Sequence, residues 1–193
     1  MRSRWALVVM GAWLAGTICV SVVATENFYT IDRLLAERPN PHFAAAVTRI
    51  GQPEIRDMLR YLSSELNRLY FQLWNGAQLV LGACVLWLVR SSRSLPTGDA
   101  VAVMTPTERR RVQAGVAMML AIVALMIVYL TPAIVSLGRS LDFVPRSPAP
   151  AGIERFWILH ASYTTLEMIK LVTGCVVTYR IQAIWKHPER LPV

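Results

Sequence analysis

The stretch His160–Lys170 reads HASYTTLEMIK and places a histidine, a glutamate and a lysine inside an otherwise apolar segment. This segment runs from residue 156 to about residue 183, which is long enough to cross the hydrocarbon core of a membrane as a helix. A charged side chain at the centre of a bilayer is energetically costly. We therefore expect this helix to turn its charged face toward other helices and not toward lipid.

Further segments have the length and apolar character of membrane-spanning helices, at about residues 5–24, 69–89 and 113–137. Charged residues make up 17% of the 193 residues, against about 25% in a typical soluble domain. The predicted fold class is therefore all-α, a four-helix transmembrane bundle, with residues 1–193 forming a single integral membrane domain. The first apolar segment is longer than the core of a usual signal peptide, so we expect the protein to retain it.

The net charge of +8 comes largely from arginines that flank the predicted spans, which argues against nucleic acid as a partner. Lys and Arg accumulate on the cytoplasmic side of membrane proteins. We therefore predict that both termini are cytoplasmic, in a multi-pass protein of the cell membrane, the inner membrane of a bacterium, with the lipid bilayer as its partner. The basic residues that carry this prediction are Arg2, Arg4, Arg90, Arg93, Arg109, Arg110, Arg111, Arg180, Lys186 and Arg190.

Residues 25–68 are predicted to form a helical hairpin outside the membrane. Apolar residues with helical spacing extend the first span to Leu35, and a second such stripe runs from Ile55 into the second span. Pro53 suits the first turn of a helix. Between the stripes, NPHFAAAVTRIG (residues 40–51) predicts a short connecting helix. We expect the two apolar stripes to pack together.

Polar residues share one face of the last span and one face of the second. At 100° per residue, His160, Tyr163, Glu167 and Lys170 fall within an arc of about 80°. We expect a ligand or ion pocket that opens outward, with Glu167 and Lys170 as its floor. An alternative stays open, in which the amides and the ion pair only hold the helices together. The predicted pocket residues are His160, Tyr163, Glu167, Lys170, Asn75, Gln78, Ser21 and Tyr129.

The sequence predicts no catalytic residue and no metal site, because it contains no HExxH, GxSxG or phosphate-binding loop motif. No cofactor is predicted, although haem through His160 and a methionine, or copper through Cys19, a methionine and His160, stay open as alternatives. We expect a non-enzymatic protein that binds a small ligand or ion, or that supports a partner, which includes a second copy of the chain. The alternatives are a redox or transport component with His160, Glu167 and Lys170 as a proton or metal relay, and a structural subunit of a larger membrane complex.

Short strings along the chain resemble those of a known family. They are GAWLAG (11–16), ELNRLYFQLWNGAQLVLG (65–82), YLTPAIVSL (129–137), and a last span with Phe156, His160 and Ser162. On these strings the chain resembles the transmembrane protein 205-like family, also called domain of unknown function 4149. The resemblance implies a four-helix membrane bundle and little about activity. Glu167, Lys170 and the long outer hairpin depart from that family's pattern.

Overall fold

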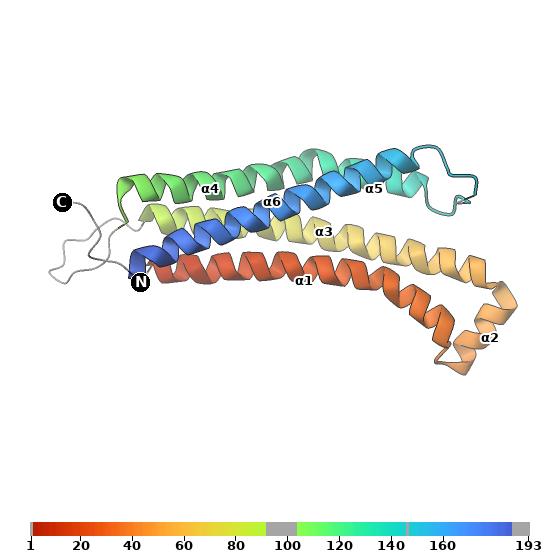
Figure 1. The fold of residues 1–193 in the computed structure, drawn as a ribbon. Helices are drawn as coiled ribbons and strands as arrows, with labels where there is room; N and C mark the ends of the chain where they lie inside the picture. The colour runs from red at the N-terminus through yellow and green to blue at the C-terminus, as the bar shows by residue number, and fades with distance from the viewer. Residues whose placement is uncertain (1, 92–103, 146, 187–193) are drawn as a thin grey trace.

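A computed structural model describes residues 2–91, 104–145 and 147–186 of the protein (Figure 1). Every regular element in these ranges is helical, which confirms the all-α class. Arg93 and Arg190, which contribute to the predicted orientation, lie outside the described residues. The elements are α1 (Arg2–Glu37), α2 (Pro41–Ile50), α3 (Gln52–Ser91), α4 (Pro106–Leu125), the π-helical turn η1 (Met126–Leu130), α5 (Thr131–Ser140) and α6 (Ile153–Lys186).

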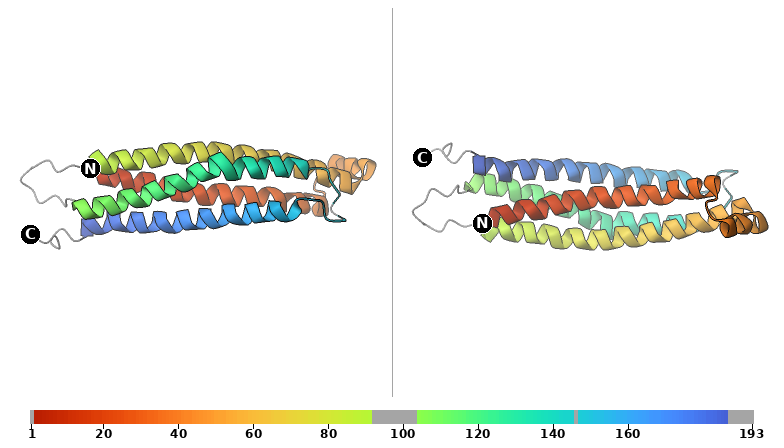
Figure 2. Two further views of the ribbon diagram at one scale, coloured as in Figure 1. Left: turned by 90° about the horizontal axis from the view of Figure 1, so that it is seen from above. Right: turned by 90° about the horizontal axis from the view of Figure 1, so that it is seen from below.

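The long helices run side by side. Helices α4, η1 and α5 form one continuous column, which lies beside α1, α3 and α6 (Figures 1 and 2). Helix α1 packs on α3 and α6, and α4 also packs on α3 and α6, so the helices surround a common interior. Helix α1 begins and α6 ends at one end of the molecule, the terminal end, and α2 lies at the opposite end, the hairpin end (Figure 1).

Three helical stretches within the described residues are long and apolar enough to cross a membrane. They are Arg4–Glu37, Gln52–Ser91 and Pro106–Ser140, and they agree with the prediction of a membrane protein. Helix α6 has a similar length of 34 residues, but Glu167 and Lys170 interrupt its apolar middle. The number of four spans therefore stays a prediction.

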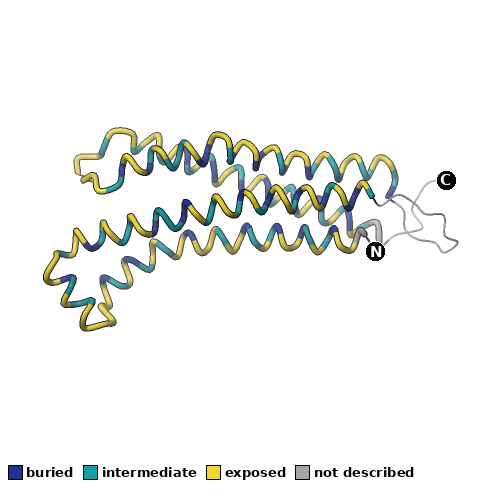
Figure 3. The backbone as a smooth tube through the Cα atoms, turned by 180° about the vertical axis from the view of Figure 1, so that it is seen from behind, coloured by how far each residue is buried: buried dark blue, intermediate teal, exposed yellow. Residues whose placement is uncertain are grey.

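Buried residues form a stripe along the inner side of each long helix, and the outward sides are exposed (Figure 3). Trp13, Val85, Met119, Val177 and Ile181 are among the residues of the main apolar core, which lies toward the terminal end. This outward exposure of apolar side chains is expected where lipid, and not water, surrounds the helices.

The predicted helical hairpin is present, and the side of the membrane on which it lies stays a prediction. Helix α3 has 40 residues and is about 60 Å long at 1.5 Å per residue, twice the thickness of the hydrocarbon core. Beyond the apolar spans, Ile31 and Leu35 of α1 pack with Val47 of α2 and Ile55 of α3. The prediction that the two apolar stripes pack together is confirmed.

The helix starts follow the capping residues that the sequence contains. Asn40 Oδ1 accepts hydrogen bonds from the backbone N–H groups of His42 and Phe43 at the start of α2. Gly51 adopts a φ of 112° between α2 and α3, a backbone conformation that glycine tolerates and other residues rarely adopt. Thr105 Oγ1 accepts from the backbone N–H of Glu108, with Pro106 as the first residue of α4. These contacts fix where the helices begin.

Pro132 lies two residues after the end of the π-helical turn η1. The sequence favours a kink at this proline, because proline lacks the N–H that a helix needs. In the structure the backbone N–H of Thr131 donates to the carbonyl of Met126, five residues earlier, which widens the turn before the proline. A π turn inserts one additional residue into a helix. As a result, Thr131 and Gly138 lie on the buried side of the column.

Candidate functional site

A buried ion pair lies in the middle of α6. The Lys170 ammonium donates a hydrogen bond to Glu167 Oε1 at 2.7 Å, and the two residues are 1% and 8% exposed. They are three positions apart, so they lie on the same side of the helix. The prediction that these charges face the other helices is confirmed.

The ion pair is connected to α3 and α1 through Gln78. The Lys170 ammonium also donates to Gln78 Oε1, and the Trp13 indole Nε1 donates to the same oxygen at 2.9 Å. Because both partners are donors, the carbonyl oxygen of the Gln78 amide must face them and its nitrogen must point away. The orientation of this buried amide is therefore determined by its neighbours.

The hydrogen bonds continue from Gln78 to the η1–α5 column. Gln78 Nε2 donates to Asn75 Oδ1 at 3.3 Å, and Asn75 Nδ2 donates to Thr131 Oγ1 at 3.1 Å. We call the connected residues the buried polar chain. It consists of Glu167, Lys170, Gln78, Trp13, Asn75 and Thr131, and it joins α6, α3, α1 and α5.

Two further residues of the predicted pocket lie on the same helix as the ion pair. The Tyr163 hydroxyl is 3.5 Å from Asn75 Oδ1, a long hydrogen bond, and its ring packs edge-on against Phe71. His160 is half-buried, with Nδ1 3.3 Å from the backbone oxygen of Phe156 and its ring centroid 4.3 Å from that of Phe156. Tyr163 thus borders the buried polar chain, whereas His160 contacts its own helix.

Ser21 and Tyr129 do not join this cluster. Ser21 is exposed, and its hydroxyl donates to the backbone oxygen of Thr17 in the same helix. Tyr129 is 53% exposed, because the π turn rotates the column and places Thr131 inside instead. Sequence reasoning therefore did not identify the direction in which these two side chains point around their helices.

The sequence analysis missed Trp13 as a hydrogen-bonding residue. A tryptophan in an apolar helix looks like a packing residue, but its buried indole N–H needs an acceptor. The side chain of Trp13 is fully buried, and Gln78 supplies that acceptor. One feature of the sequence could have revealed this contact. Trp13 and Gln78 are expected at the same depth on neighbouring helices, where a buried amide can accept the indole N–H.

Two buried side-chain oxygens have no hydrogen-bond partner within the part of the chain that the structure describes. They are Glu167 Oε2 and Thr17 Oγ1. A buried polar atom without a partner is costly, so such atoms in a native protein call for an explanation. The packing of the described residues therefore leaves one carboxylate oxygen of Glu167 without a hydrogen bond.

A groove of about 760 Å³ lies between α3 and the η1–α5 column. Asn75 and Thr131, two members of the buried polar chain, are part of its wall. Of the residues predicted to line a pocket, Asn75 is the one that this groove contains. The full lining is Gln72, Asn75, Gly76, Ile127, Thr131, Pro132, Val135, Ser136 and Arg139.

Ion pairs at the hairpin end lie beside this groove. Arg139 donates from Nη2 to Glu65 Oε2 at 3.2 Å, Arg68 also pairs with Glu65, and Arg68 Nη2 lies 3.0 Å from Asp142 Oδ2. We call these four residues the outer ion cluster. Hydrogen bonds from Arg139 and Arg68 hold the pKa of the Glu65 carboxyl, outside the apolar stretch 69–89, below its usual value. Glu65 therefore stays charged at neutral pH, and the cluster ties α3 to the end of α5.

The described residues contain no group of three or more His, Cys, Asp or Glu side chains placed to hold a metal ion. Cys19, Cys84 and Cys175 are free and exposed. Cys19 therefore lies on the outward side of α1, away from the buried polar chain. This arrangement does not test the prediction that the protein has no cofactor, and haem and copper stay open as its alternatives.

Comparison of the chain with protein-family models, with curated proteins and with solved structures found no match. The resemblance to the transmembrane protein 205-like family therefore stays a prediction from short strings of sequence.

Proposed function

We propose that this chain is a non-enzymatic membrane protein that binds a small ligand in the groove between α3 and the η1–α5 column. The observation that carries this proposal is the double role of Asn75 and Thr131, which line the groove and belong to the buried polar chain. A ligand in the groove lies against one end of this chain, and the ion pair of Glu167 and Lys170 lies at the other. The volume of the groove is within the usual range for ligand sites.

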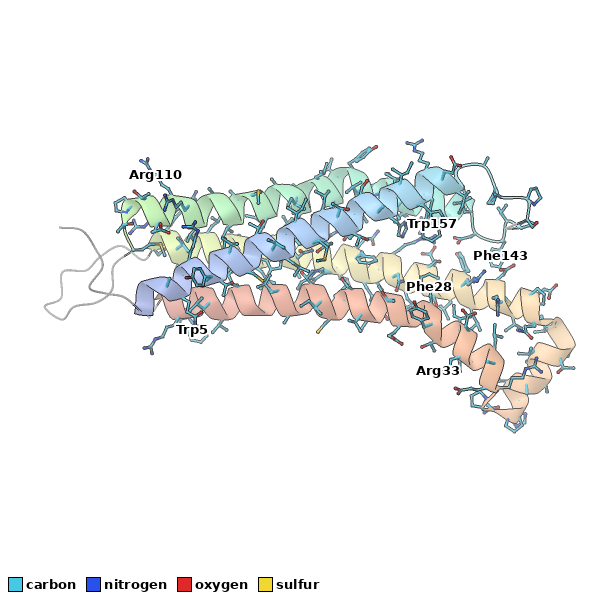
Figure 4. All side chains as sticks on the ribbon, in the orientation of Figure 1. Trp5, Phe28, Arg33, Arg110, Phe143 and Trp157 are labelled. Carbon is cyan, nitrogen blue, oxygen red and sulfur yellow. The ribbon has the colours of Figure 1, made fainter. Side chains whose placement is uncertain are left out.

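We further propose that the protein crosses the membrane four times, with both termini cytoplasmic and the hairpin outside, in the inner membrane of a bacterium. Inward-facing charges on α6 support a fourth span, because they leave its outward side apolar. Trp5 near the terminal end and Trp157 toward the hairpin end are 60% and 61% exposed, and Figure 4 shows them far apart along the molecule. Tryptophans at opposite depths are typical of the two membrane interfaces. The strings that resemble the transmembrane protein 205-like family support the same arrangement.

Two glycines allow a direct test of ligand binding in the groove. No atom lies within 4 Å of a Cβ built on Gly76, which lines the groove, or of one built on Gly11 of α1. Leucine should therefore fit at both positions without disturbing the packing, but only Gly76→Leu fills the groove. Gly11→Leu is the matched control.

The experiment measures small molecules retained by the protein after purification in mild detergent, by native mass spectrometry. We expect Gly76→Leu to lower the retained ligand at least about tenfold, the loss that follows when about 1.4 kcal/mol of binding free energy is removed. Gly11→Leu should retain as much as the wild type. Equal retention of the ligand in both variants would contradict the proposal. Co-purification of a protein partner in stoichiometric amount, without a small molecule, would favour the structural-subunit alternative.

The unpartnered oxygen of Glu167 favours a second candidate function, a proton relay. Glu167 Oε2 is buried and lacks a hydrogen-bond partner among the described atoms. A proton could therefore bind to this oxygen without displacing an existing hydrogen bond. Infrared spectra recorded across a pH titration should then show a carboxyl band that Glu167→Gln removes. A spectrum that is identical in wild type and Glu167→Gln at every pH argues against a relay.

A further inference from the structure

The groove has a polar rim and an apolar interior. Arg139, Ser136 and Gln72 lie at its end nearest the hairpin end, and Ile127 lies at its other end. Arg139 and Ile127 are twelve positions apart along one column, which corresponds to about 18 Å at the rise of a helix. A ligand that fills the groove must therefore be elongated, with a polar head and an apolar body.

The polar groups in the deeper part of the groove are already occupied. Asn75 Nδ2 donates to Thr131 Oγ1, and Asn75 Oδ1 accepts from Gln78 and Tyr163. Asn75 and Thr131 are both buried, at 2% and 9% exposure. Beside them the wall consists of Pro132, Val135, Ile127 and the bare backbone at Gly76, a surface that suits a hydrocarbon chain.

The rim offers hydrogen-bond donors. The Arg139 side chain is 60% exposed and pairs with Glu65 through Nε and Nη2. A guanidinium has further N–H groups, so this ion pair leaves donors for an oxyanion. Ser136 and Gln72 are exposed beside it. Arginine with neighbouring hydroxyl and amide groups is suited to a phosphate.

Arg139 belongs both to the rim and to the outer ion cluster, so the charge of that cluster indicates which phosphate compound fits. The outer ion cluster contains two arginines and two carboxylates, so its charges balance. Because the cluster has no net charge, it does not favour a ligand with a net negative charge. It suits a phosphodiester whose negative charge is balanced by an amine in the same head group. A membrane glycerophospholipid has this head and an apolar body of the required kind.

We infer that the groove binds one glycerophospholipid from the bilayer, with its phosphate at Arg139 and an acyl chain along Val135, Pro132 and Gly76. The groove lies at the surface of the molecule, between α3 and the η1–α5 column. The lipid therefore enters it sideways from the membrane. This inference rests on the proposed function and specifies the chemical class of its ligand.

The test uses the full chain, delipidated in detergent and titrated with defined probes in native mass spectrometry. The probes are a phosphatidylethanolamine, the diacylglycerol with the same acyl chains, and glycerol 3-phosphate. Diacylglycerol lacks the phosphate, and glycerol 3-phosphate lacks the chains. We expect one phosphatidylethanolamine per protein, with each of the other probes bound at least about tenfold more weakly.

Arg139→Gln should weaken phosphatidylethanolamine binding about tenfold, the loss expected when one charge-assisted hydrogen bond is removed. The matched control is Arg33→Gln, since Arg33 is an exposed arginine on α1 in the outer hairpin (Figure 4). If diacylglycerol binds as tightly as the phospholipid, or if Arg139→Gln has no effect while Gly76→Leu blocks binding, the phospholipid inference is overturned and the groove function stands. If Gly76→Leu leaves all binding unchanged, both are overturned.

Discussion

Lys170 lies one helical turn after Glu167 in α6, and its Nζ atom is 2.7 Å from the carboxylate oxygen of that residue inside the protein. Gln78 from α3 accepts a second hydrogen bond from the same ammonium. Removing one partner of a buried ion pair is strongly destabilising, because it leaves an uncompensated charge inside the protein. The hydrogen bond to Gln78 connects the pair on α6 to α3.

Lys170→Met tests this role. The substitution leaves the Glu167 carboxylate buried without its partner, and we expect it to lower the free energy of unfolding by roughly 3–5 kcal/mol. The double variant Glu167→Gln with Lys170→Met should recover most of that loss, because no charge remains inside. Denaturant unfolding in mild detergent, followed by circular dichroism, measures both. A single variant as stable as the wild type would show that the pair does not hold the helices.

Trp13→Phe tests the contact between α1 and α3. The change removes the indole N–H that donates to Gln78 and keeps most of the aromatic surface. We expect a loss of roughly 0.6–2 kcal/mol in unfolding free energy, the range for interhelical hydrogen bonds in membranes. Trp5→Phe in the same helix is the control, since Trp5 is 60% exposed. Equal losses in the two variants would mean that the Gln78 contact adds nothing.

Replacement by leucine should destabilise the protein at Gly82 but not at Gly76, although both glycines lie in α3. A Cβ on Gly82 would collide with Leu120 and lie 2.9 Å from Trp13, whereas a Cβ on Gly76 meets no atom within 4 Å. Overpacking of this kind costs roughly 1–3 kcal/mol, so Gly82→Leu should lower the unfolding temperature and Gly76→Leu should not. A reversed order would contradict the packing of α3 against α4 and α1.

Asp142→Asn tests the outer ion cluster. Asp142 follows α5 and pairs with Arg68 of α3, whose side chain is 10% exposed. We expect a loss of roughly 1–3 kcal/mol, below the value for a fully buried pair because some solvent reaches the site. Asp57→Asn on the same helix as Arg68 is a suitable control, because Asp57 is exposed. Unfolding free energies measure the difference, and an unchanged value for Asp142→Asn would contradict the proposed link between α3 and α5.

Much of the fold follows from local features of the sequence. Asn40 before Pro41 and Thr105 before Pro106 identify where α2 and α4 begin, since capping residues act within one turn. The inward position of Glu167 and Lys170 also follows from sequence, because hydrocarbon is so unfavourable for charge that one direction is strongly preferred. Length and helical period are enough for these predictions.

The direction of single polar side chains depends on contacts between helices and was harder to predict. Tyr129 is outside and Thr131 inside because of the π turn before Pro132, which shifts the column by one residue. Ser21 satisfies its hydroxyl within α1, as a serine in a helix can do anywhere. The groove at Gly76 depends on the spacing of α3 and the η1–α5 column, which no local pattern encodes.

The most direct test of the ligand-binding account is a crystallographic or electron-microscopy density map of the protein purified with its native lipids. The account predicts one elongated density between α3 and the η1–α5 column, with its densest part beside Arg139 and a tail passing Gly76. A map in which protein side chains fill that groove, leaving no room for a ligand against Asn75 and Thr131, would contradict it.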